Sequence, residues 1–311
     1  MLTEALVIAF FVMGLQLMVP ILWAALGETI VEQSGVLNVG IEGVMLIGAL
    51  VTALVGINLG SLPLAILAAV GSGLLCGGLL SYLYVRRGTD QIVTGLLFNM
   101  FAVGFTGVIH TLFLAGQIGV TLSEIKIPGI RSIKWVGEVL SKQNIMLYVG
   151  LLLAAGVYYL LHRTWWGLYA RAASQRPTAV EAAGLSVWRL RYPALLIGCT
   201  LSSVAGSALV LGTSGGFVPG MTAGRGFIAL GVVVVARWRP TFVILGATLF
   251  GMTQGLQFLA GRLTALQSVP TQVWLALPYL ITVAAVVLAP GSRYPAAIGI
   301  PYKGQGRRRL A

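Results

Sequence analysis

The sequence predicts an all-α protein, a polytopic bundle of about nine transmembrane helices (eight to ten) that the whole chain, residues 1–311, forms as a single domain. Of the 311 residues, 58% are hydrophobic and only 9% are charged, whereas an ordinary soluble domain has roughly 25% charged residues. The charges are clustered, and several of the uncharged runs between them exceed the ~20 residues that cross a bilayer. The 41 glycines fit this environment, because small residues let membrane helices pack closely.

Nine apolar segments define the predicted spans. In chain order they are Leu6–Leu26, Val36–Ile57, Leu62–Val85, Ile92–Ala115, Ile145–Leu161, Pro193–Leu211, Phe227–Ala236, Phe242–Ala260 and Val273–Ala289. The first is preceded by no positive region and followed by no small-residue cleavage pattern, so we expect it to be retained and not removed as a signal peptide. The seventh is too short to cross as a regular helix. It is therefore expected to be re-entrant or to extend backward through Ala223-Gly224-Arg225.

The distribution of Lys and Arg predicts the orientation of the bundle. One set of connecting segments carries 14 of the 20 basic residues, and cytoplasmic loops carry such an excess. This set is Glu28–Gly35, Arg86–Asp90, Arg163–Arg191, Arg237–Arg239 and the tail from Arg293. The opposite side includes the mixed-charge segment 116–143. In a plasma or inner membrane we therefore expect the amino terminus outside and the carboxy terminus in the cytoplasm.

The sequence indicates neither catalysis nor a metal site. Cys76 and Cys199 lie inside apolar runs, where a free cysteine behaves as a small hydrophobic residue. The chain contains no Gly-x-x-x-x-Gly-Lys-Ser/Thr stretch, so it is not expected to hydrolyse ATP itself. The stretch 212–216 fits a nucleophile pattern but follows a membrane helix instead of a strand, and we interpret it as an outer turn. The net charge of +12 does not predict nucleic-acid binding, because the basic residues lie between apolar runs and not on a soluble module.

The segment Arg163–Arg191 is the most informative connection. Pro177 suits the first turn of a helix and Gly184 the position just after its end. These two residues predict a short cytoplasmic helix of about two turns that contains Glu181.

The apolar side chains of this short helix are expected to be exposed. Val180 and Leu185 cannot be buried by so small an element alone, so the helix needs a partner surface. Anionic lipid is one alternative, since each nearby Lys or Arg gains about 1 kcal/mol there. Docking on another protein is the interpretation that a capped helix followed by Gly-Leu-Ser favours.

Four stretches resemble the permeases of ATP-binding cassette (ABC) importers. Glu181-Ala182-Ala183-Gly184-Leu185-Ser186 is similar to the EAA-type coupling loop, the element that docks on the ATPase subunit. Three further stretches are similar to the branch for simple sugars and nucleosides. They are Ser34–Gly43, Thr222–Leu230 and Pro295–Tyr302. Within that branch, Gly35–Gly43 resembles the nucleoside permeases that work with a membrane-anchored binding lipoprotein more than it resembles the ribose-type members.

The resemblance implies a type II ABC importer-like permease domain whose cytoplasmic coupling loop is segment 163–191. It implies import of a nucleoside, or of a simple sugar, through a pathway shared with a second and related permease subunit. ATP would be bound by a separate ABC ATPase subunit, an extracytoplasmic substrate-binding lipoprotein would deliver the solute, and membrane lipid would surround the bundle. The permease itself would need no cofactor. The coupling residues that the resemblance implies are Arg176, Glu181, Ala182, Ala183, Gly184 and Leu185.

Six side chains are candidates for the substrate pathway. They are Asn38, Glu42, Phe98, Asn99, Arg225 and Phe227. Neutral amides suit a nucleoside or sugar in passage, aromatic rings can stack on it, and a charge held at membrane depth usually faces protein or water. The alternatives are interhelical hydrogen bonds for the amides, packing or lipid contact for the aromatic rings, and a position near the interface for the two charges. Two other acidic residues, Glu28 and Glu32, are expected to be solvated.

Two other classes of protein remain as alternatives. An ion-gradient-driven secondary transporter usually carries carboxylates within the membrane, and only Glu42 and Asp90 are available here. An intramembrane enzyme would need a nucleophile with a base or a metal cluster, and His110 and His162 lie in separate spans. Both alternatives have little support in the sequence.

Overall fold

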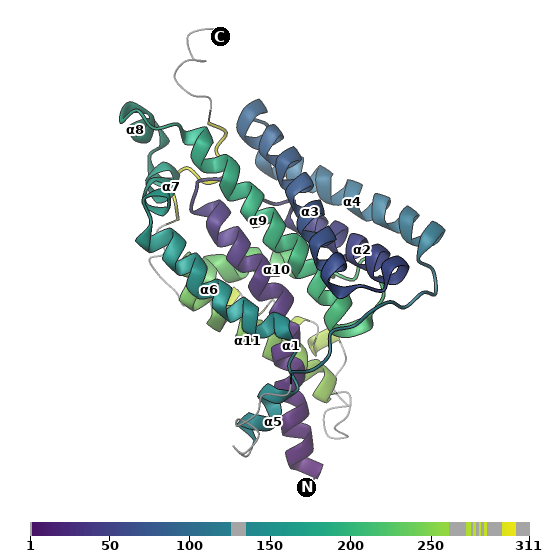
Figure 1. Cartoon of the computed structure of the whole chain (residues 1–311). Helices are drawn as coiled ribbons and strands as arrows, with labels where there is room; N and C mark the ends of the chain where they lie inside the picture. Colours follow the sequence, from purple (N-terminus) through teal and green to yellow (C-terminus); the bar gives the residue numbers. More distant parts are fainter. Residues whose placement is uncertain are drawn as a thin grey trace.

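The computed structural model describes residues 2–125, 135–260 and 294–302, with short pieces between 272 and 284, and every regular element in these parts is helical (Figure 1). The elements are α1 (Leu2–Glu32), α2 (Ile41–Leu59), α3 (Leu62–Ser81), η1 (Tyr82–Arg87), α4 (Gln91–Phe113), α5 (Val136–Ser141), α6 (Ile145–Arg163), α7 (Trp165–Gln175), α8 (Pro177–Ala182), α9 (Val187–Leu209), η3 (Val210–Ser214), α10 (Arg225–Val235) and α11 (Pro240–Ala260). The short π-helical turns η1 and η3 continue α3 and α9.

Local capping explains where several of these helices begin and end. Asp90 caps α4 by accepting a hydrogen bond from Val93 N at 2.9 Å, and Asn144 caps α6 in the same way. Such caps satisfy N–H groups that the first turn of a helix leaves free. Gly60 and Gly88 adopt the left-handed conformation that ends α2 and η1, a conformation that glycine enters without steric cost.

Six helical stretches are long and apolar enough to cross a membrane: α1, α2, α3 with η1, α4, α6 and α9 with η3. The helix α11 matches the predicted segment 242–260, and α10 is as short as expected, at 11 residues. The predicted ninth segment, 273–289, lies mostly outside the described residues. The polytopic helical bundle is therefore confirmed, and the count of about nine spans stays a prediction.

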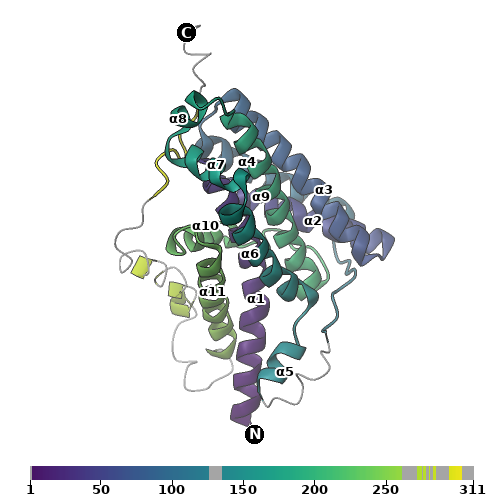
Figure 2. The same ribbon diagram turned by 60° about the vertical axis from the view of Figure 1, so that its left-hand side comes forward.

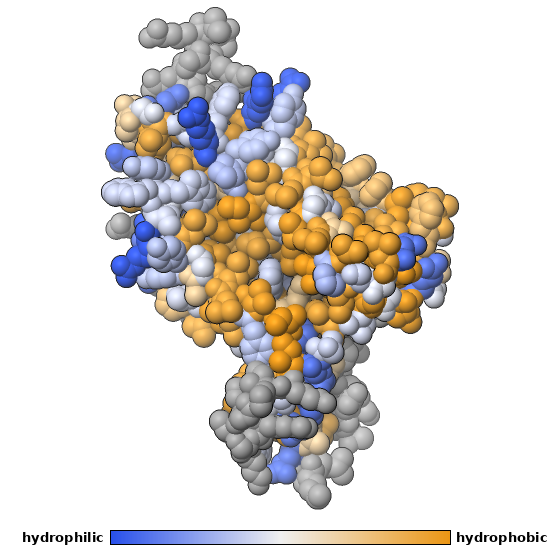
Figure 3. All heavy atoms as spheres, viewed as in Figure 1, coloured by the Kyte–Doolittle hydropathy of each residue, from blue (hydrophilic) through white to orange (hydrophobic). Residues whose placement is uncertain are grey.

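The surface of the molecule agrees with a membrane location. Hydrophobic atoms form a broad band across the middle, and hydrophilic atoms gather toward the end that carries α7 and α8 (Figure 3). The helices α3 and α4 contribute many exposed apolar side chains to this band, among them Leu75, Leu97 and Met100. A soluble protein would leave such a surface in water at high cost, whereas lipid covers it without cost.

The helices α1 and α9 form the centre of the bundle (Figure 1). The helix α9 packs along α1, α2 and α3 through small side chains, and three of its serines, Ser202, Ser203 and Ser207, are fully buried. A Cβ atom added to Gly206 would lie 1.9 Å from the carbonyl oxygen of Met45 in α2. Backbones that approach so closely lack the layer of side chains that usually separates two helices.

A methyl group at Gly206 should therefore destabilise the bundle. We expect Gly206→Ala to cost about 1–3 kcal/mol, the usual cost of forcing extra volume into a packed core, and to lower the melting temperature of the detergent-solubilised protein. Gly78→Ala is the matched control, because a Cβ there meets no heavy atom within 4 Å and alanine favours helix. A melting temperature for Gly206→Ala at or above that of the control would show that the α2–α9 contact is looser than described.

The segments that the sequence assigns to the inner side lie together at one end of the bundle. Gln33 Nε2 donates a hydrogen bond to the carbonyl oxygen of Trp238 at 3.3 Å. Ala297 N donates to the carbonyl oxygen of Ser174 at 2.8 Å. Residues after α1, in the α10–α11 turn, in the segment 163–191 and in the segment 294–302 therefore meet at this end, as predicted.

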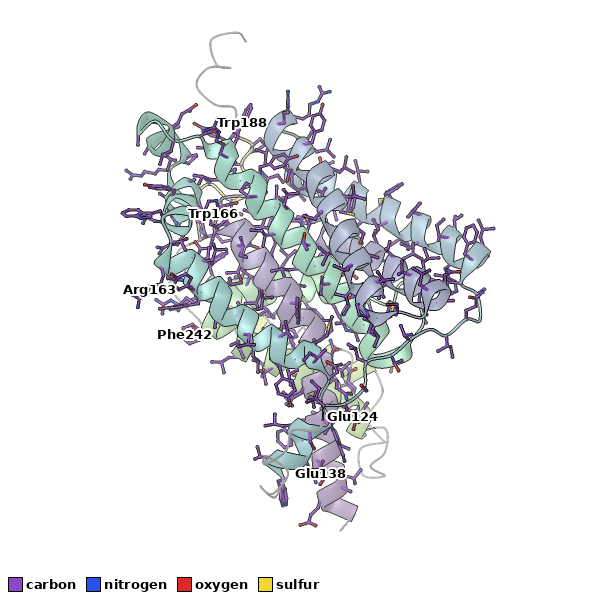
Figure 4. The ribbon with its side chains drawn as sticks, in the orientation of Figure 1. Glu124, Glu138, Arg163, Trp166, Trp188 and Phe242 are labelled. Atoms are coloured by element: carbon purple, nitrogen blue, oxygen red, sulfur yellow. The ribbon has the colours of Figure 1, made fainter. Side chains whose placement is uncertain are left out.

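The segment 116–143 lies at the opposite end. Gln143 Nε2 donates to the carbonyl oxygen of Val12, near the start of α1, at 3.2 Å. Figure 4 shows Glu124 and Glu138 at this end and Trp188 at the other. The grouping of loops into two sides is thus the predicted one, and the assignment of one side to the cytoplasm stays a prediction.

The expectation that Glu28 and Glu32 are solvated is wrong. Their exposed fractions are 0% and 1%, because α1 continues through Glu32 and the chain that follows folds back over it. Glu28 Oε1 accepts a hydrogen bond from Asn38 N at 2.9 Å, and Glu32 Oε2 accepts one from Trp238 Nε1. Both acidic side chains are therefore buried within the end of the bundle that carries α7 and α8.

Candidate functional site

The chain between α1 and α2 turns back into the bundle instead of passing directly into the next span. Gly35, at a φ of +86°, makes the turn possible, because a side chain is disfavoured in that conformation. Leu37 N then donates to Gln91 Oε1 at 2.7 Å, and the Asn38 amide Nδ2 lies 3.5 Å from Cys199 Sγ on α9. We call residues 33–40 the return loop. Because of this loop, α2 begins inside the protein at Ile41.

The start of α2 meets the start of α10 through one carboxylate. Glu42 Oε1 accepts a hydrogen bond from Gly224 N at 2.8 Å, and Glu42 Oε2 accepts one from Gly226 N at 2.7 Å. The N–H groups of a first helical turn have no partner within their helix, and the helix dipole favours a negative charge there. The Glu42 carboxylate supplies both the hydrogen-bond acceptors and the negative charge, and the residue is only 9% exposed. It thus lies within the protein and does not extend to the surface.

The helix α10, which begins at the contact with Glu42, has only 11 residues, about half the length of a membrane-spanning helix. It lies about halfway between the two ends of the molecule, whereas α11 continues toward the end that carries the amino terminus (Figures 1 and 2). Its amino end follows Gly224, which has a left-handed conformation at φ +79°. The expectation that segment 227–236 does not cross as a regular helix is confirmed, and its start extends back only to Arg225.

Two candidate residues of α4 hold the start of α2 in place. Asn99 Oδ1 accepts from Gly43 N at 2.8 Å, and Asn99 Nδ2 donates to the Val39 carbonyl oxygen at 2.8 Å. Phe98 is 7% exposed and packs in an apolar cluster with Val44. The interhelical and packing alternatives therefore describe these contacts well, and contact of either side chain with a solute stays a prediction.

The other two candidates lie in the first turn of α10. Arg225 Nη1 donates to the carbonyl oxygens of Met221 and Thr222, at 3.0 and 3.3 Å. Phe227 is 43% exposed. Of the six candidates, Phe227 offers the most accessible surface to a ligand.

The structure brings the six candidates into one region. Asn38 and Glu42 come from the return loop and the start of α2, and Phe98 and Asn99 approach from α4. Arg225 and Phe227 flank the glycine whose N–H reaches Glu42. We call the contact of Glu42 with the start of α10 the helix junction.

Two glycines at the helix junction leave room for the contacts of Glu42 and Asn99, and sequence reasoning did not single them out. A Cβ at Gly226 would lie 2.7 Å from Glu42 Oε2, and a Cβ at Gly43 would lie 2.9 Å from Asn99 Oδ1. Both glycines occur in the stretches that carry the family resemblance, which is the one signal that could have identified them.

The segment 163–191 folds as a helical hairpin at the end of the bundle opposite the amino terminus. Thr164 caps α7 by accepting from Gly167 N at 3.1 Å, Pro177 opens α8, and Gly184 follows it at φ +81°. Leu185 N donates back to the Val180 carbonyl oxygen at 3.1 Å, as in a Schellman ending. The predicted short helix with its two caps is confirmed, and α7 is an additional helix that the sequence analysis did not predict.

The expectation that Val180 is exposed is wrong. Its side chain is 6% exposed and packs with Ala173, Val187 and Leu190, with Leu185 half-buried beside them. The extra helix α7 and the first turn of α9 supply this apolar surface, so α8 does bury its apolar side within the chain.

The tip of the hairpin remains accessible. Arg176, Ala182, Ala183 and Gly184 are exposed, and a Cβ on Gly184 would meet no heavy atom within 4 Å. Among the described residues, the tip thus leaves room for another molecule. We call residues 176–185 the coupling tip.

Comparisons with known proteins agree on one class. A family model described as "Branched-chain amino acid transport system / permease component" matches residues 10–287. The putative glucose ABC transporter permease protein TsgC13 of Haloferax volcanii is 32% identical over 292 residues, covering 86% of this chain and 88% of that protein. The guanosine ABC transporter permease protein NupQ of Bacillus subtilis is 30% identical over 297 residues, covering 91% and 92%. No solved structure matches the chain.

Further relatives occur as pairs. The nucleoside ABC transporter permease protein NupC of Lactococcus lactis is 26% identical over 294 residues, covering 91% of this chain and 93% of that protein. In each of these three organisms a second permease protein with a matching name, TsgB13, NupP or NupB, is also similar, at 25%, 25% and 22% identity.

Proposed function

This chain belongs to the family described as the permease component of branched-chain amino acid transport systems, and from that premise we propose that it forms half of the translocation pathway of an ABC importer for nucleosides. Its named relatives are ABC transporter permeases for nucleosides and sugars, and the chain is accordingly a permease subunit. The return loop and the half-length helix α10 are the structural features that suit this work.

The helix junction is the observation that carries the proposal. Two helices, α2 and α10, start inside the protein and are joined by the Glu42 carboxylate. In secondary transporters, discontinuous helices place their ends at the substrate site, and we propose the same use for the ends of α2 and α10 in this importer. Phe227 is exposed and directly follows Gly226 of the junction, where its ring can stack on a base or a sugar.

The substrate class rests on two arguments. Two of the three relatives described above are named for guanosine or nucleosides, and the stretch 35–43 resembles nucleoside permeases. A simple sugar is the second candidate, because the relative with 32% identity is named a glucose permease.

The remaining parts of the importer follow from the same premise. A second permease subunit completes the pathway, as the paired permeases of the relatives suggest. A separate ATPase subunit binds ATP and docks on the coupling tip, which therefore faces the cytoplasm, while an external binding lipoprotein delivers the solute. The amino terminus is then outside the cell, and this chain has no ATPase site of its own.

Purification and uptake test the proposal together. The chain is purified in mild detergent, its associated subunits are identified by mass spectrometry, and the complex is placed in liposomes with ATP inside. We expect ATP-dependent uptake of labelled guanosine or another nucleoside that persists when ionophores collapse the ion gradients. Uptake that continues without ATP but stops with the ionophores would contradict the proposal, and ATP-dependent uptake of glucose alone would replace the nucleoside by a sugar.

A further inference from the structure

We propose that Tyr302 is a positioning residue that connects the coupling tip to the return loop, so that movement of the tip reaches the helix junction. The inference rests on the proposed function, because it assigns a route to the ATP-driven movement. It arises from segment 294–302, which is far in sequence from α7 and α8 but contacts both, α7 through Ala297 and α8 through Tyr302 (Figure 1).

The first contact of this route joins Tyr302 to the coupling tip. The Tyr302 hydroxyl donates a hydrogen bond to Glu181 Oε2, and the ring packs in the apolar cluster of Val180 and Leu190. Hydrogen bonds to an ionised carboxylate are shorter and stronger than neutral ones. Tyr302 therefore follows α8 when the tip moves.

The second contact joins Tyr302 to Arg191. The guanidinium carbon Cζ lies 5.8 Å from the centroid of the Tyr302 ring, within the range of a cation–π contact. Arg191 is 2% exposed and is the largest of the fully buried side chains. No acidic residue among the described parts of the chain forms an ion pair with it.

The third contact joins Arg191 to the return loop. Arg191 Nε donates to the Ser34 carbonyl oxygen at 3.3 Å, and a Cβ on Gly35 would lie 2.8 Å from Arg191 Nη2. A buried charge without a carboxylate partner depends on every contact that it has. Arg191 is thus fixed between the Tyr302 ring and the turn from which the return loop begins.

The other end of segment 294–302 contacts the turn that follows α10. The rings of Tyr294 and Trp238 meet edge to face with centroids 5.2 Å apart, and Trp238 Nε1 donates to Glu32. Trp238 lies in the turn between α10 and α11, three residues after Val235 ends α10. The segment is therefore linked to the return loop through Tyr302 and Arg191, and it touches the turn after α10 through Tyr294.

This arrangement gives Tyr302 a role that packing alone does not explain. Its hydroxyl binds Glu181 of the coupling tip and its ring faces Arg191, so the hydroxyl contact can be removed alone or together with the ring contact. Tyr302→Phe removes only the hydroxyl. Tyr302→Leu removes both contacts but keeps an apolar side chain in the cluster.

The test measures solute transported per ATP hydrolysed by the complete complex in liposomes. We expect Tyr302→Phe to lower this ratio about 3-fold and Tyr302→Leu about 10-fold or more, with ATP hydrolysis and the melting temperature close to those of the unaltered complex. Tyr159→Leu is the matched control, because Tyr159 lies on α6 and is 63% exposed; its ratio should not change.

A second measurement does not depend on transport. Hydrogen exchange of backbone amides in residues 36–43 should respond to ATP with vanadate in the unaltered complex, and this response should be lost in Tyr302→Leu. A Tyr302→Leu complex with an unchanged transport ratio and an unchanged response would overturn the inference. The inference would also be overturned if Tyr302→Leu lowered ATP hydrolysis and uptake equally because the complex had lost its ATPase subunit. Absence of ATP-dependent uptake by the unaltered complex would instead contradict the proposed function.

Discussion

Replacing Glu42 with alanine is expected to abolish uptake while the protein still inserts in the membrane. The change leaves the N–H groups of Gly224 and Gly226 without their acceptor. A buried donor without a partner costs about 1–3 kcal/mol. Two such donors therefore raise the free energy of the joined helices by about 2 kcal/mol or more, which corresponds to a fall of roughly 30-fold or more in the rate of uptake. Uptake into liposomes, normalised to inserted protein, measures this loss.

A milder substitution at Glu42 should cause a smaller loss of uptake. Glu42→Gln keeps one oxygen acceptor and should lower uptake only about 3- to 10-fold, since it loses one of two charge-assisted hydrogen bonds. Glu4→Gln is the control, because Glu4 is an exposed carboxylate near the start of α1. If Glu42→Ala transported as well as Glu42→Gln, the carboxylate would not be what joins α2 to α10.

A bulky residue at Gly184 is expected to separate ATP hydrolysis from uptake. Gly184 has a φ of +81°, and its surroundings are open. A β-branched residue in that conformation is strained, and its side chain would occupy the space that the ATPase subunit needs. We expect Gly184→Val to reduce uptake per ATP about 10-fold or more, whereas Gly184→Asn, a residue that tolerates this conformation, should have a much smaller effect.

Gly116 provides the matched control for this prediction. It has a similar left-handed conformation, at φ +74°, and no heavy atom within 4 Å of an added Cβ, but it lies after α4, outside the segment 163–191. Gly116→Val carries the same backbone strain without touching the coupling tip. Equal losses of coupling in Gly184→Val and Gly116→Val would show that strain, and not docking, is the cause.

Features that depend on neighbours in sequence were well predicted. Pro177 and Gly184 mark the ends of α8 because each acts on its own backbone. The short length of α10 follows from the apolar run itself, which Arg225 and Arg237 bound. Likewise, the two groups of connecting loops follow from the alternation of spans.

Features that depend on distant partners were not predictable in this way. Glu28 and Glu32 look like solvated residues of a loop, because the groups that bury them come from the return loop and from Trp238, about 200 residues away in the second case. Hydrophobic periodicity cannot show that a chain turns back into a bundle. The helix junction joins Glu42 to the backbone N–H groups of Gly224 and Gly226. Every residue except proline has such a group, so the sequence does not show which ones will bind a distant carboxylate.

The close approach of Gly206 to Met45 has a consequence for how transport can proceed. Where backbones touch with no side chains between them, the two helices have no layer on which to slide. The helices α2 and α9 must therefore travel as one rigid body during each cycle. Hinge motion is then left to the irregular stretches before α2 and after η3, residues 33–40 and 215–224, and the glycines there set how far the backbone can bend.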